Sequence, residues 1–138
     1  ALYGLHEALL MLHEEGLETA WARHALNHRA LRAGLEAMGL RLAGVDGERL
    51  PQLNVVSIPD GVDDAAVRQT LLRDYDLEIG AGLGEFAGKA WRIGLMGQSA
   101  SRRHVLTCLT ALGGALARQD RRVDLSTALA AAEGVYSS

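Results

Sequence analysis

Residues 80–97 read GAGLGEFAGKAWRIGLMG, and the rest of the chain is best interpreted outward from this stretch. Its second half alternates with a period of two, which predicts a strand with Trp91, Ile93 and Leu95 on one face. Arg92 falls on the opposite face. A guanidinium keeps its charge, and burying one unpaired is costly. The residues therefore predict an anion opposite Arg92: a carboxylate of this chain, which is the commoner arrangement, or a bound substrate anion.

The first half of this stretch has the glycine spacing Gly80-x-Gly82-x-Gly84. A dinucleotide-binding fingerprint needs a further glycine and then a helix, and a phosphate-binding loop needs glycine at position 83 and Ser or Thr at position 90. The chain has Leu83 and Ala90 there, so neither nucleotide motif is present. The glycines indicate a loop whose backbone turns tightly or approaches a ligand closely.

The composition is that of a single globular domain. The 138 residues carry a net charge of −3 with interspersed signs, which gives no reason to expect nucleic acid or a membrane surface as a partner. No apolar run reaches membrane-spanning length. The single cysteine, Cys108, suits a reducing cytoplasm, and the excess of arginine over lysine suggests a bacterial source.

Helical spacing dominates the first 39 residues. Two long helices are predicted, on either side of Gly16, from two apolar stripes: Leu2, Leu5, Leu9 and Leu12, then Leu17, Trp21, His24, His28, Leu31, Leu35 and Met38. The first stripe starts in mid-register without a capping residue, so we expect a piece of a longer chain.

The remainder predicts strands at 40–44, 53–58, 75–79 and 90–96. Between and after them we expect a helix capped by Asp63 or Asp64, with Val67, Leu71 and Leu72 facing inward, a helix capped by Ser99 or Ser101, and an alanine-rich helix at 124–133. This order favours an α+β domain with a mostly antiparallel sheet of about four strands, packed under helices and preceded by two long helices.

Other candidate sites are weaker. His24 and His28 have a spacing that can ligate zinc, but they lack a third ligand, so packed, hydrogen-bonded histidines are favoured and no metal site is predicted. Ser99 lies in a segment that resembles a nucleophile elbow without its final glycine, and helix capping explains it. Cys108 falls on an apolar helical stripe and is interpreted as a small core residue.

Taken together, three segments resemble the C-terminal small domain of class V pyridoxal-phosphate aminotransferases, nearest to the alanine–glyoxylate and serine–pyruvate type. The segments are residues 2–9 with 15–18; residues 21–24 with 31–35 and 38–40; and residues 77–84 with 88–89 and 92–97. The resemblance covers residues 1–117, so the single domain, 1–138, would end in an extension at 118–138.

The resemblance implies the small domain of a fold-type I enzyme. Pyridoxal 5′-phosphate would bind mainly in a larger N-terminal domain, through a Schiff-base lysine that has no counterpart here, since Lys89 precedes the Arg92 strand. Arg92 would bind the α-carboxylate of the amino or keto acid, and Gly82 and Gly84 would shape the site's loop. The resemblance further implies a homodimer, and a chain that holds no catalytic residue and is inactive without its large domain.

Two alternatives stay open. The chain could be a stand-alone module that binds a small carboxylate or dimerises without catalysis. It could also come from another class V enzyme such as a desulfurase, although Cys108 lies on a helical stripe and not in a mobile loop.

Overall fold

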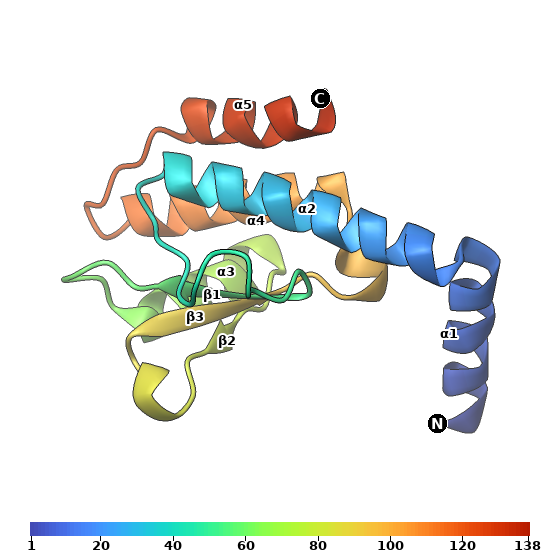
Figure 1. The fold of residues 1–138 in the computed structure, drawn as a ribbon. Helices are drawn as coiled ribbons and strands as arrows, with labels where there is room; N and C mark the ends of the chain where they lie inside the picture. The colour runs from blue at the N-terminus through green and yellow to red at the C-terminus, as the bar shows by residue number, and fades with distance from the viewer.

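Helices cover one side of a small antiparallel sheet in the computed structural model, which describes all residues 1–138 (Figure 1). The layers run from α5 through α2 and α4 to the sheet, with α3 beside it. The helices are α1 (Leu2–Glu15), α2 (Leu17–Ala37), α3 (Asp64–Tyr75), α4 (Arg102–Ala117) and α5 (Leu125–Tyr136). The strands are β1 (Leu53–Ser57), β2 (Gly80–Ala81) and β3 (Ala90–Gly94), and two short 3₁₀ turns are η1 (Gly84–Phe86) and η2 (Gly97–Ser99). The predicted α+β class is confirmed.

The sheet has three strands in the order β1-β3-β2, not the four that we predicted. The segment at 40–44 makes only one bridge, between Leu42 and Val56, at the free edge of β1. The predicted strand at 75–79 is wrong, because α3 continues to Tyr75 and Asp76 then ends it in a left-handed conformation, with φ of 50°. The only residues of that region that pair are those of β2.

Alternation along β3 separates the core from the open face of the sheet as predicted. Trp91, Ile93 and Leu95 are at most 4% exposed and pack beneath the helices. Val105, Leu109 and other residues of the α4 stripe complete this core, and Cys108 is buried within it. Burial of these apolar side chains provides the main stabilisation of the fold.

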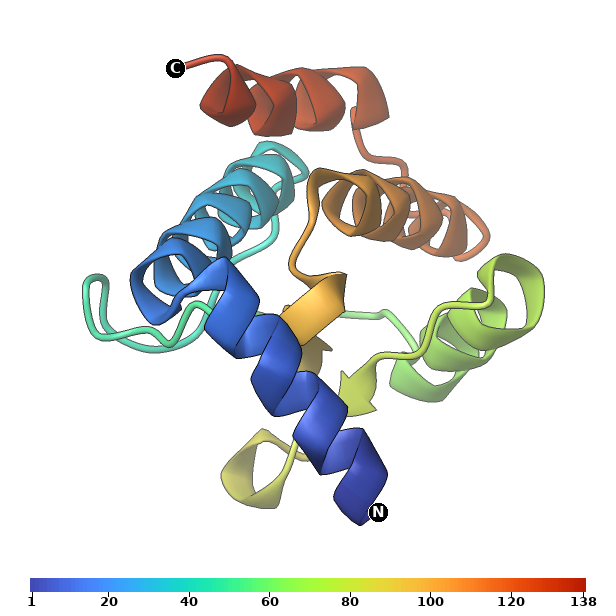
Figure 2. The same cartoon turned by 90° about the vertical axis from the view of Figure 1, so that its right-hand side faces the viewer.

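The apolar stripe of α1 is helical as predicted, but it does not pack on the rest of the domain. No residue of α1 is buried, and Leu2 and Leu9 are 82% and 57% exposed. Gly16, with φ of 84°, bends the chain so that α1 projects away from the body (Figure 1). In the turned view, α1 runs in front of the rest of the domain (Figure 2). Trp21 is 60% exposed too, so the stripe of α2 enters the core only from His24 onward.

Helix ends follow the capping rules. Asp63 and Ser101, from the two predicted pairs, are the caps: Asp63 accepts from the backbone N–H of Ala66, and Ser101 from that of His104. Leu72 is 55% exposed, contrary to the prediction.

The last helix, α5, runs one turn further than predicted, to Tyr136, and packs on α2 and α4. No helix of the chain has the length and apolar character needed to cross a membrane.

Candidate functional site

Arg92 lies on the open face of the sheet, at the centre of β3. Val55 of β1 and Gly80 of β2 are its partners in the sheet register, one on each side. The guanidinium leans toward β2, where its Nε–H donates to the carbonyl oxygen of Ala81 at 2.8 Å. Nη1 and Nη2 donate to no group of the protein. A guanidinium held through Nε presents its other edge as a fork that fits a carboxylate.

No acidic side chain of this chain pairs with Arg92. The other four arginines that are not exposed are each paired with a carboxylate: Arg23, Arg32, Arg49 and Arg68. Arg92 is therefore the one sheltered arginine without an internal counter-ion. The sequence left two candidates for the anion opposite Arg92, and the structure places no carboxylate of this chain there.

In the loop before β3, glycine is required at one position by lack of space for a side chain and favoured at another by backbone conformation. A Cβ on Gly82 would lie 2.0 Å from the carbonyl oxygen of Phe86, so no side chain fits there. Gly84 has φ of +57°, a left-handed conformation that favours glycine, and its surroundings are open. Gly80 lies directly beneath the guanidinium, because a Cβ there would be 3.0 Å from Nη2 of Arg92. The loop thus returns tightly to β3 and brings Arg92 against β2.

A shallow apolar hollow of about 450 Å³ lies on the same face of the sheet. Its floor is formed by Leu53 and Val55 of β1, and Phe86 and the loop at 43–50 form its walls. Since Val55 pairs directly with Arg92, the hollow adjoins the strand that carries the guanidinium. The open face of the sheet therefore combines the unpaired guanidinium of Arg92 with an apolar surface.

The turn that follows β3 is bound to α2. His24 Nε2 accepts from the backbone N–H of Gly97 at 3.2 Å, and Arg23 Nη1 donates to the carbonyl oxygens of Gly97 and Ala100 at 2.7 and 3.0 Å. Asn27 Nδ2 donates to the same Ala100 oxygen at 3.1 Å. One polar face of α2 thereby fixes the end of the segment that contains Arg92.

Comparison with known proteins shows which family the chain resembles. No protein-family model matches the chain. It is 43% identical over 137 residues to the (S)-ureidoglycine–glyoxylate transaminase of Bacillus subtilis, and 42% identical over 136 residues to the pyridoxamine–pyruvate transaminase of Mesorhizobium japonicum. These matches cover 99% and 98% of this chain, and 33% and 35% of the two relatives. The crystal structure of the Bacillus subtilis ureidoglycine–glyoxylate aminotransferase matches with a TM-score of 0.94, over 99% of this chain and 35% of that one.

The chain belongs to the class V aminotransferases, as their small domain. An alanine–glyoxylate aminotransferase from Nostoc sp. is also similar in structure, with a TM-score of 0.80 and 46% identity over 83% of this chain and 30% of that one. The chain spans about a third of the length of the relatives that it matches.

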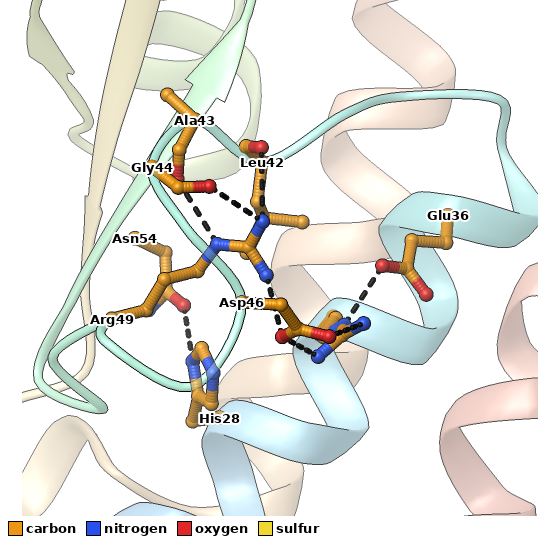
Figure 3. A network of polar contacts seen from close by, with 9 residues as sticks. His28, Glu36, Leu42, Ala43, Gly44, Asp46, Arg49 and Asn54 are labelled. Carbon is orange, nitrogen blue, oxygen red and sulfur yellow. Dashed lines mark hydrogen bonds and ion pairs between the residues drawn. The ribbon is translucent and has the colours of Figure 1, made fainter.

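A second polar network stiffens this small domain at the edge of β1 (Figure 3). The Arg49 guanidinium donates to the carbonyl oxygens of Ala43 and Gly44 at 3.0 Å each, and it pairs with Asp46. Asp46 also pairs with Arg32, whose guanidinium lowers the pKa of that carboxyl group. These contacts fix the loop that walls the apolar hollow.

His28 lies in the same view and reaches the sheet itself. Its Nδ1 is 2.6 Å from Oδ1 of Asn54, whose Nδ2 donates to the carbonyl oxygen of Ile93 at 3.3 Å. Both predicted histidines thus have protein hydrogen-bond partners, and no group of three or more potential metal ligands occurs in the chain. Lys89 is exposed at the start of β3.

Burial raises the pKa of the Cys108 thiol to about 12, which keeps it protonated at neutral pH. The interpretation as a core residue is confirmed.

The sequence placed Gly80 in the glycine-rich loop that shapes the site, but its predicted strand ended at Ile79 and so did not include the pairing of Gly80 with Arg92. Arg23 was missed as part of this site. Arg23 gave no signal, because its partners Gly97 and Ala100 are more than 70 residues away in the sequence.

Proposed function

We propose that Arg92 binds the carboxylate of the substrate in a cytoplasmic transaminase of the alanine–glyoxylate or serine–pyruvate type. The observation that carries this proposal is a sheltered guanidinium that has no acidic partner in its own chain and two free nitrogens. Glyoxylate and pyruvate, which the names of the relatives give as amino acceptors, are both 2-oxo acids. The carboxylate is the group that these acceptors share, and it is the group that a guanidinium fork binds best.

The role of this small domain is to orient the substrate. A carboxylate held at two nitrogens of Arg92 leaves the adjacent carbon with restricted freedom, and such positioning contributes strongly to rate. Pyridoxal 5′-phosphate would supply the electron sink for the transfer when bound beside this domain. The free nitrogens of Arg92 fit a substrate carboxylate. The cofactor would be held mainly by the large domain of the same enzyme, in a homodimer.

The test uses the intact protein with its cofactor, assayed for amino transfer to glyoxylate and to pyruvate. We expect Arg92→Ala to lower kcat/KM by about 10²- to 10³-fold, since two charge-assisted hydrogen bonds are lost. Arg92→Lys, which keeps the charge but lacks the fork, should recover only part of this loss.

The matched control is Arg29→Ala, because Arg29 is an exposed arginine of α2 without an ion pair. Cofactor absorbance should be retained in all three variants. Equal activity of Arg92→Ala and Arg29→Ala would show that Arg92 does not bind the substrate, and a wild-type protein inactive with both acceptors would refute the proposed function as a whole.

A further inference from the structure

The polar face of α2 contacts the segment that contains Arg92 at its far end. We propose that His24, together with Arg23, is a positioning residue for the Arg92 guanidinium, acting through the turn at residues 96–100. The inference rests on the proposed role of Arg92 in binding the substrate. It assigns a function to two side chains that the carboxylate never touches.

The hydrogen bonds of His24 define a single state of its ring. Nδ1 lies 2.6 Å from the carbonyl oxygen of Ala20, which can only accept, so Nδ1 carries the hydrogen. Nε2 must then be the unprotonated nitrogen, and it accepts from the N–H of Gly97. His24 is 9% exposed, and both of its nitrogens are engaged, so the ring cannot turn without losing a buried hydrogen bond.

Arg23 holds the same turn from the side of its carbonyl groups. Its Nη1 donates to Gly97 and Ala100, while Nε and Nη2 are bound by the two carboxylate oxygens of Glu15. The Glu15 carboxylate raises the pKa of Arg23 and fixes the plane of its guanidinium. Both the N–H and the C=O of Gly97 are thereby held by adjacent residues of one helix.

This anchorage matters for Arg92 because the sheet around it is small. On the side toward which the guanidinium leans, β2 supplies only two residues, and its Ala81 carbonyl is the one protein group that fixes the side chain. β3 ends at Gly94, and the buried Leu95 after it donates its N–H to the carbonyl oxygen of Gln52 at 2.8 Å. Beyond Leu95, the turn is held by side chains of α2 at Gly97 and Ala100. Movement of this turn changes the course of β3 and hence the direction of the guanidinium, and small misplacements of an orienting group are costly in catalysis.

The decisive variant is His24→Leu in the intact, cofactor-loaded enzyme. Leucine fills the buried space but leaves the Gly97 N–H without an acceptor. We expect KM for the 2-oxo acid to rise about five- to tenfold, with kcat changed less, because an orienting contact is loosened and not removed. His24→Gln, whose side-chain oxygen can accept from Gly97, should restore most of the wild-type KM.

Asp124→Ala is the control for stability, because it removes the N-cap of α5, on the opposite side of the domain from the sheet (Figure 1). It should lower the melting temperature without raising KM. If His24→Leu does not fold, Arg23→Lys takes its place with the same expectation, since lysine cannot bind both carbonyls and Glu15 together.

A double-mutant cycle separates positioning from general damage. In an Arg92→Ala background, His24→Leu should raise KM by less than about twofold, because the group that it positions is gone. The proposal would be overturned if His24→Leu lowered the melting temperature without changing KM. It would also be overturned if the KM of the double variant rose by the product of the two single effects. If Arg92→Ala itself leaves KM unchanged, the proposed function fails, which is a distinguishable result.

Discussion

Gly82 should be the least replaceable glycine of the loop before β3. An alanine Cβ there would lie 2.0 Å from the Phe86 carbonyl oxygen, 2.6 Å from its carbon and 2.9 Å from the Ala90 oxygen. The closest comfortable carbon–oxygen contact is about 3.3 Å, so the overlap exceeds 1 Å. All three atoms belong to the backbone and cannot rotate away. We therefore expect Gly82→Ala to destabilise the domain by about 3 kcal/mol, at the upper end of the usual cost of overpacking.

Two neighbouring glycines provide matched controls. Gly84→Ala has open space but a φ of +57°, so it should cost about 1 kcal/mol. Gly94→Ala has no left-handed conformation, and its nearest contact is 3.8 Å, so its effect should be close to zero or slightly stabilising. Thermal unfolding of the three intact variants, followed by circular dichroism, should rank Gly82→Ala far below the other two. A Gly82→Ala protein as stable as Gly84→Ala would refute this account of the loop.

Three further predictions concern the core, the first turn of α3 and the loop at 43–50. Cys108 should resist alkylation at pH 8 in the native protein and react only after denaturation, because burial raises the pKa of its thiol to about 12. Mass spectrometry of the peptide that contains Cys108 measures the labelling, and rapid labelling of the native protein would contradict this prediction. The Arg68 guanidinium and then the Trp91 N–H lower the pKa of Asp64, so the stability that this carboxylate contributes should be complete above about pH 4 and lost as the pH falls through the lowered pKa. Asp64→Asn should therefore lose about 1 kcal/mol at pH 7 and show a flatter decline below pH 4 in denaturant titrations; a decline as steep as in the wild type would argue against it. Arg49→Ala leaves the carbonyls of Ala43 and Gly44 without their donor, so limited proteolysis should cut the loop at 43–50 earlier than in an Arg41→Ala control; equal cleavage would show that Arg49 does not hold the loop.

The alternation of residues 90–96 could be interpreted correctly because a half-covered sheet imposes its own period of two. Trp91 and Ile93 face the helices, and Arg92 faces away, as the sequence indicates. The same physical rule could not identify the anion, because an internal carboxylate and a bound substrate make the same demand on a guanidinium. The structure shows only that no carboxylate of this chain pairs with Arg92, and the substrate carboxylate is our proposal for the anion.

The sequence-based predictions failed where the structure of a segment depends on packing or pairing partners that are distant in the sequence. Leu77 and Ile79 alternate like a strand, but no neighbouring strand reaches them, and only Gly80 and Ala81 pair with β3. Apolar spacing in α1 predicts a helix correctly but cannot say what its stripe packs against, and in this structure Leu2 and Leu9 are exposed. The anchoring role of Arg23 depends on carbonyl groups that no local pattern reveals.

The most direct test of the central claim compares an acceptor that has a carboxylate with the same acceptor without it. The intact wild-type enzyme and its Arg92→Ala variant are assayed for amino transfer to pyruvate and to acetaldehyde. If Arg92 binds the carboxylate, the wild type should prefer pyruvate by about 10²-fold or more in kcat/KM, and the variant should lose most of that preference while its rate with acetaldehyde stays the same. A variant that keeps the full preference for pyruvate, or that loses activity with both acceptors equally, would contradict the claim.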